Sequence, residues 1–151
     1  MRIADQIVSE NVSIERTIQT MKDIVLENAL NESFKFWCFR TFTNTTYTHD
    51  LYRKVWEYVQ NNFKYEDDPV DEQITAPKWL IEIKKGDCDD FATFIKTVLK
   101  VFGIESDFLV CGRERENYSH VVVRTHDGVV LDGTNDKFNC LNPQYVFCKV
   151  V

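Results

Sequence analysis

The sequence contains little glycine and proline and no long uncharged apolar run. Five glycines and three prolines among 151 residues argue against a flexible linker or a disordered chain. Charged residues interrupt the apolar pattern of "MRIADQIVSENVSIERTIQTMKDIVL", which excludes a signal peptide or a membrane-spanning helix in this stretch. Internal repeats and low-complexity tracts are also missing. We therefore expect one globular unit in the cytosol, without a membrane partner.

The net charge and the cysteine spacing argue against nucleic-acid binding, a disulfide framework and a zinc site. The net charge is -6 and no basic run occurs, which argues against nucleic acid as the main partner. The five cysteines are odd in number and include no C-x-x-C pair, so neither a disulfide framework nor a zinc knuckle is indicated. We expect neither a metal ion nor a cofactor.

Helical spacing dominates the first two thirds of the chain. Residues 1–47 are predicted to form a helical extension. Its apolar face is formed by Ile3, Ile7, Ile14, Ile18, Met21, Val25 and Ala29. The aromatic stretch "FKFWCFRTF" that follows is expected to pack in the core. Residues 48–151 would form the main domain, opening with a helix over 48–62 that is capped by Thr48 or Asp50. A short helix around 79–83 and a long helix over 88–102 complete the helical part.

After Gly103 the pattern changes to that of strands. Four segments rich in valine and aromatic residues span 104–111, 118–125, 129–132 and 145–150, with an "HDG" turn between the second and third. Helices come first and strands follow, an order typical of an α+β fold with an antiparallel sheet.

One cysteine has unusual neighbours. Cys88 lies in "KKGDCDDFA", immediately after a glycine and at the expected start of the long helix. A helix N-terminus favours the thiolate, whereas Asp87, Asp89 and Asp90 would raise the pKa of the thiol. We interpret these acidic residues mainly as helix caps and solvated charge. Position alone cannot activate the thiol, so a base is needed.

The best candidate base is His120. His126 lies in the expected turn, and His49 opens a helix without an evident carboxylate partner, whereas His120 begins the strand "HVVVRT". A three-residue loop over 126–128, with Gly128 in the left-handed conformation, pairs Val122 with Asp132. His120 and Asp132 then become diagonal neighbours on one face of the hairpin. The sequence thus predicts a Cys88, His120, Asp132 triad.

These residues and their order resemble the transglutaminase-like domain, a branch of the papain-like cysteine-enzyme superfamily. The resemblance runs from "YRKVWEYVQNNFKY" through "GDCDDFATFIKTVLKVFGIESDFLV" to "SHVVVRTHDGVVLDGT", over residues 48 to 135. It implies a papain-like α+β fold, with the nucleophile at a helix N-terminus packed on an antiparallel sheet. It also places the catalytic cysteine, histidine and aspartate on Cys88, His120 and Asp132.

The resemblance implies hydrolysis of peptide or side-chain amide bonds in a protein or peptide substrate through a thioester. Acyl transfer to an amine and a non-catalytic binding module with the same fold remain open alternatives. For the oxyanion we expect the Cys88 amide and a second donor, either the hydroxyl of Tyr65 or the indole of Trp79. Arg113, Arg115 and Tyr118 lie on the loop that leads to His120 and are candidates for substrate contact or for a solvated turn.

Overall fold

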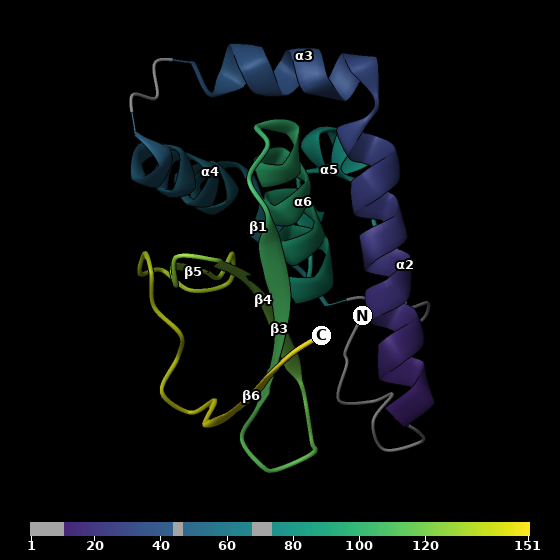
Figure 1. The fold of residues 1–151 in the computed structure, drawn as a ribbon, viewed down its shortest axis with the longest axis vertical. Helices are drawn as coiled ribbons and strands as arrows, with labels where there is room; N and C mark the ends of the chain where they lie inside the picture. Colours follow the sequence, from purple (N-terminus) through teal and green to yellow (C-terminus); the bar gives the residue numbers. More distant parts are fainter. Residues whose placement is uncertain (1–10, 44–46, 68–73) are drawn as a thin grey trace.

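The computed structural model describes residues 11–43, 47–67 and 74–151. Its helices are α2 (Asn11–Ala29), α3 (Glu32–Thr41), α4 (Thr48–Asn62), α5 (Pro77–Ile83) and α6 (Cys88–Val101). Its strands are β1 (Lys64–Tyr65), β2 (Lys85–Gly86), β3 (Ser106–Gly112), β4 (His120–Thr125), β5 (Val130–Leu131) and β6 (Phe147–Val150). The predicted order, helices first and then the strands of the antiparallel sheet, is confirmed (Figure 1).

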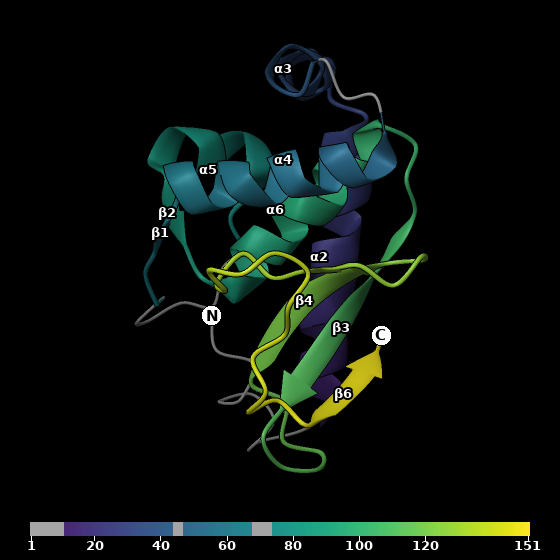
Figure 2. The same ribbon diagram turned by 90° about the vertical axis from the view of Figure 1, so that its left-hand side faces the viewer.

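The strands form an antiparallel sheet and a separate small pair. The sheet has the order β5-β4-β3-β6, so β5 and β6 are its edges. The pair β1-β2 is parallel and joins Tyr65 to Gly86, two residues before Cys88; its two-residue strands were not predicted. In Figure 2 the helices α4, α5 and α6 lie above the sheet, and α2 runs past both.

Helix α6 is the centre of the hydrophobic core. Its apolar face carries Phe91, Phe94, Ile95, Val98 and Leu99, all of them buried. Helices α2, α3, α4 and α5 and strands β3 and β4 all pack against it. Burial of this many large side chains holds the first turn of α6, and so Cys88, in a fixed place.

The helical extension shares this core. The α2 residues Ile14, Ile18, Met21 and Val25 are buried in the same cluster as α6, as their spacing predicts. Ile3 and Ile7, assigned to the same face, lie outside the described residues.

The aromatic stretch after α2 is only partly in the core. Helix α3 buries Phe34 and Cys38, and Phe42 just after it is buried as well, as expected for core packing. Phe36 and Phe39, however, are 65% and 46% exposed. The expectation of core packing therefore holds for one face of α3 and is wrong for the other.

Helix α4 begins at the predicted residue but without the predicted cap. Tyr47 holds the N-cap position and makes no side-chain cap hydrogen bond, so the assignment of Thr48 or Asp50 is wrong. Near this helix start, His49 has a carboxylate partner after all: its Nε2 lies 3.0 Å from Oδ2 of Asp127 in the β4–β5 turn. This contact joins residues 78 positions apart in the chain, which local sequence patterns do not reveal.

The β4–β5 hairpin has the predicted register. Val123 pairs with Leu131 and Arg124 with Val130, and the Thr125 amide donates to the Val129 carbonyl at 2.9 Å. The loop therefore has three residues, with Gly128 at a φ of 91°. The same register places Val122 opposite Asp132 and His120 diagonal to it.

Candidate active site

Cys88 is the first residue of α6, as predicted. Asp87 is the N-cap: its Oδ1 accepts hydrogen bonds from the amides of Asp89 and Asp90, at 3.2 and 3.3 Å. The Asp90 carboxylate accepts from the Asp87 amide at 3.0 Å, which completes a capping box. Asp90 also accepts from the Thr75 amide at 2.7 Å. The thiol thus stands at a helix terminus that is held by two carboxylates.

The interpretation of the acidic residues as solvated charge is wrong. Asp87, Asp89 and Asp90 are all buried. Two of them are caps, whereas Asp89 faces the thiol, with its Oδ1 accepting from the Cys88 sulfur at 3.8 Å. The sequence pattern predicts caps but does not separate the residue that contacts the sulfur from those that contact the backbone.

The environment of the Cys88 thiol favours its protonated form. Cys88 is only 5% exposed, and this burial is the main cause of a pKa well above the ordinary value of the thiol. The negative charge of Asp89 raises the pKa further, and a hydrogen bond from the Val121 backbone partly offsets it. Burial and Asp89 therefore favour the neutral thiol of Cys88 over its thiolate.

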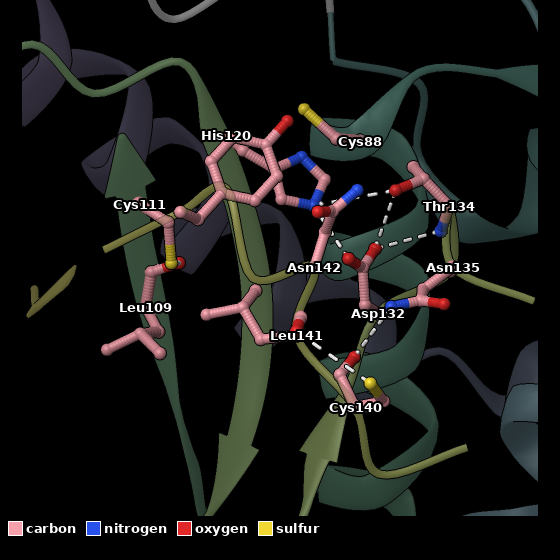
Figure 3. A network of polar contacts seen from close by, with 12 residues as sticks. Cys88, Leu109, Cys111, His120, Asp132, Thr134, Asn135, Cys140, Leu141 and Asn142 are labelled. Carbon is pink, nitrogen blue, oxygen red and sulfur yellow. Dashed lines mark hydrogen bonds and ion pairs between the residues drawn. The ribbon is translucent and has the colours of Figure 1, made fainter. Parts of the chain in front are cut away.

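His120 and Asp132 are brought together by the hairpin. His120 Nε2 lies 2.8 Å from Asp132 Oδ2, and the two side chains are 6% and 2% exposed. A carboxylate only accepts hydrogen bonds, so Nε2 carries the proton and Nδ1 is left as the acceptor. Figure 3 shows the imidazole between the Cys88 sulfur and the Asp132 carboxylate, with its other nitrogen turned toward the sulfur.

Asp132 is itself held by further hydrogen bonds. The Thr134 amide and hydroxyl donate to Asp132 Oδ1 at 2.9 and 2.7 Å, which leaves Oδ2 for His120 (Figure 3). The Trp56 indole in α4 donates to the Asp132 carbonyl at 3.0 Å. These contacts fix the carboxylate and, through it, the orientation of the imidazole. Sequence reasoning missed both residues: Thr134 follows directly in "LDGT", but no local pattern points to Trp56.

One face of the imidazole is covered by Tyr145. The two rings are stacked, with centroids 4.7 Å apart and an angle of 14° between their planes. Tyr145 lies in the segment 135–146, which we call the strap; it joins Thr134 to β6. A stacked aromatic ring shields the His120–Asp132 hydrogen bond from water and restricts rotation of the imidazole. The sequence assigned Tyr145 only to a strand.

A polar pocket of about 450 Å³ lies beside the pair. It is lined by Asp132, Thr134, Asn135, Asp136, Asn142, Gln144 and Tyr145. Most of these are strap residues that carry amide, hydroxyl or carboxyl groups. The pocket therefore presents hydrogen-bonding groups beside the His120–Asp132 pair.

Of the two expected oxyanion donors, the structure brings one close to Cys88. Tyr65 pairs with Gly86, and its ring contacts Phe91, with centroids 6.3 Å apart. Its hydroxyl donates to Asp67 Oδ1 at 2.7 Å, and burial together with this bond raises its pKa, so it stays a neutral donor. Trp79 instead lines a pocket between α5 and α3 with Phe34 and Trp37. The structure does not bring Trp79 to the thiol.

The three substrate-loop candidates, Arg113, Arg115 and Tyr118, have different neighbours in the structure. Arg113 is exposed and close enough to Tyr145 to lower the pKa of its hydroxyl, although burial of Tyr145 has the larger, opposite effect. The Arg115 guanidinium lies over the Phe147 ring at 5.4 Å. Tyr118 lines a pocket with Ile14 and Val151. Of the three, Arg113 lies near Tyr145, the residue that stacks on His120.

No cluster of three or more histidine, cysteine or acidic side chains suited to a metal ion occurs within residues 11–43, 47–67 and 74–151. In the same part of the chain, no helix is both long and apolar enough to cross a bilayer.

The sequence matches the pattern of a known family. The pattern of the transglutaminase-like superfamily matches residues 37–134, about two thirds of the chain. The match begins within α3, earlier than residue 48, and ends at Thr134, so the strap and β6 lie beyond it. Among curated proteins, none matches the chain significantly.

Three solved structures share the fold at low identity. Legionella pneumophila LapG has a TM-score of 0.57 at 20% identity, covering 87% of this chain and 79% of its own. A Cytophaga hutchinsonii protein described as a "Putative Cysteine Protease" has a TM-score of 0.56 at 13% identity, and a Parabacteroides distasonis protein described as a "Putative Protease" has 0.62 at 13%. They cover 72% and 81% of this chain, which spans only 39% and 26% of theirs.

Proposed function

The chain belongs to the transglutaminase-like superfamily, and we propose that it is a cysteine hydrolase of peptide or side-chain amide bonds that forms a thioester on Cys88. The observation that carries the proposal is the position of the His120 imidazole. Its Nε2 is bonded to the buried Asp132 carboxylate at 2.8 Å, and its other nitrogen faces the Cys88 sulfur (Figure 3).

The proposed reaction starts with a neutral thiol. Because burial and Asp89 raise the pKa of Cys88, the sulfur attacks the amide carbonyl as His120 Nδ1 removes its proton. Asp132 stabilises the resulting imidazolium and keeps Nε2 protonated. The carbonyl oxygen becomes an oxyanion, which we assign to the Cys88 amide at the N-terminus of α6 and to the Tyr65 hydroxyl.

The remaining steps return the site to its starting state. The imidazolium gives its proton to the leaving amine, the carbon–nitrogen bond breaks, and an acyl thioester remains on Cys88. Water then attacks the thioester while His120 accepts a proton from it, and the carboxylic acid leaves as the thiol is restored. For Tyr65 to serve as a donor, its hydroxyl must exchange Asp67 for the oxyanion.

The polar pocket beside Asp132 supports a protein or peptide as the substrate. Its lining of amide, hydroxyl and carboxyl groups can bind the backbone of an extended segment through hydrogen bonds. A peptide held there would lie beside the His120–Asp132 pair and contact the strap.

The thioester step can be tested without knowing the substrate. We would incubate the chain with p-nitrophenyl acetate and locate the acetyl group by mass spectrometry of the peptide 86–96, which contains Cys88. We expect a rapid release of p-nitrophenol with acetylation of Cys88, and a rate at least a hundredfold lower in His120→Ala. Cys140→Ala is the matched control and should react like the unmodified chain. Acetylation spread evenly over the cysteines would refute the proposal.

The acceptor of the acyl group can be determined in the same preparation. Casein supplied with a fluorescent primary amine reports transfer to an amine, and newly formed amino termini or released ammonia report hydrolysis. Hydrolysis without incorporation of the amine is the expected result. Incorporation that depends on Cys88 would instead favour acyl transfer.

A further inference from the structure

We propose that Cys111 and Cys148 form a reversible disulfide that fastens β6, and with it the strap, to the active-site sheet. The two residues are direct partners in the antiparallel pairing of β3 and β6. Their sulfur atoms lie 2.9 Å apart, closer than two non-bonded sulfur atoms normally approach. The pairing does not depend on the proposed chemistry of Cys88.

The backbone at this position is suited to a disulfide. The Val151 amide donates to the Phe108 carbonyl at 3.1 Å, which makes these opposed residues a hydrogen-bonded pair. Hydrogen-bonded and non-hydrogen-bonded pairs alternate along an antiparallel ladder, so Cys111 and Cys148 form a non-hydrogen-bonded pair. Cα atoms in such pairs are about 4.5 Å apart, within the range that a disulfide spans.

The two thiols differ in accessibility, which gives the reaction an order. Cys148 is exposed and Cys111 is buried. The Cys148 thiolate attacks a small disulfide such as oxidised glutathione and releases one glutathione thiolate. Cys111 then loses its proton and attacks the Cys148 sulfur, which expels the second glutathione. Two protein thiols are oxidised, one external disulfide is reduced, and two protons pass to the solvent.

The disulfide would act on the strap, whose Tyr145 covers one face of the His120 imidazole. Strand β6 is an edge strand of four residues that pairs with β3, and Cys148 is three residues after Tyr145. On the other side of β3, Cys111 is opposite His120. The disulfide would therefore join the end of the strap to the strand that lies next to His120, and so hold Tyr145 in place.

A peptide map tests the bond directly. Cys140 and Cys148 share the tryptic peptide 138–149, so the chain is prepared with Cys140→Ser to leave one cysteine in it. After treatment with oxidised glutathione, alkylation and digestion without reductant, we expect peptide 101–113 linked to 138–149, and loss of the link on reduction. Cys148→Ser in the same background must remove it. Cys148 bearing glutathione while Cys111 is alkylated would overturn the proposal.

Hydrogen exchange tests the fastening separately. In the oxidised chain, amides of residues 147–150 should exchange at least several-fold more slowly than in the reduced chain, and the melting temperature should rise by roughly 5–10 °C. Cys148→Ser should show neither change on treatment with the oxidant. A linked chain with unchanged exchange in β6 would contradict the mechanical role assigned to the bond.

Discussion

At Cys88, the helix terminus and the surrounding side chains act on the thiol in opposite directions. The start of α6 and the Val121 backbone favour the thiolate, whereas burial and the charge of Asp89 favour the thiol. Burial and the charge of Asp89 dominate, since the pKa of Cys88 is raised. In the proposed mechanism His120 therefore acts as a base in every turnover, because the thiolate is not already formed in the resting state.

Asp89→Asn tests this balance. The amide keeps the size of the side chain but removes the negative charge next to the sulfur, so the pKa of Cys88 should fall. We expect alkylation of Cys88 by iodoacetamide to become several-fold faster at neutral pH, and its pH profile to move toward lower pH. Mass spectrometry of peptide 86–96 measures the rate between pH 6 and 10.

The control for Asp89→Asn is Glu27→Gln, which removes an exposed charge on α2. It should leave the alkylation profile of Cys88 unchanged. An unchanged or higher pKa in Asp89→Asn would show that the carboxylate has another role, such as orienting the thiol.

The sequence predicts some residues of this site much better than others. Cys88, His120 and Asp132 stand out because a helix start and a hairpin register leave local patterns. Thr134 and Tyr145 do not, since a threonine after a turn and a tyrosine in a strand-like segment are common. Their contacts with Asp132 and His120 depend on the path of the strap, which has no periodicity to read.

Among the secondary-structure elements, the β4–β5 hairpin positions two residues of the proposed triad, His120 and Asp132. Its three-residue loop sets the register that places His120 diagonal to Asp132. Asp127 in this loop accepts hydrogen bonds from the hydroxyls of Thr125 and Tyr52, and its other oxygen contacts His49. The loop is thereby tied to α4, the helix that also supplies Trp56 to the Asp132 carbonyl.

Asp127→Ala should loosen this hairpin in a pH-dependent way. The Thr125 hydroxyl, followed by His49 and Tyr52, lowers the pKa of Asp127 below its ordinary value of 3.8. A lowered pKa means that the ionised carboxylate stabilises the fold above pH 3.8, and that this contribution is lost as the pH falls through the folded-state pKa. Because Asp127 is exposed, we expect a loss of only about 1 kcal/mol at pH 7.

Urea unfolding at several pH values measures this effect. The difference between Asp127→Ala and the unmodified chain should shrink progressively below pH 3.8. Asp136→Ala, which removes another exposed carboxylate, is the matched control. A difference that stays constant down to pH 2 would mean that the carboxylate charge is not involved.

The elements differ in how well the sequence predicts them, for a physical reason. The sequence predicts α6 from the spacing of its apolar residues, and it predicts the β4–β5 hairpin from the glycine in its turn. The β1-β2 pair is two residues long on each side and joins segments about twenty residues apart, so it leaves no repeat pattern. The cap of α4 was misassigned because Tyr47 takes a position that threonine and aspartate favour more often.

In the whole molecule, one core holds the site and the helical extension together. The apolar face of α2 packs on α6, although the whole of α2 lies before the part of the chain that matches the superfamily. At the other end, the strap and β6 also lie outside that match and supply Tyr145. Both additions contact elements that carry the proposed triad.

The most direct test of the central claim is the relative reactivity of the five cysteines. Cys88 should be alkylated by iodoacetamide at neutral pH faster than Cys38, Cys111, Cys140 and Cys148, because His120 can take its proton. His120→Ala should abolish this preference, whereas His126→Ala, which removes an exposed imidazole, should preserve it. If Cys88 reacts no faster than the exposed Cys148, or if His120→Ala keeps the preference, the proposed activation of Cys88 by His120 is wrong.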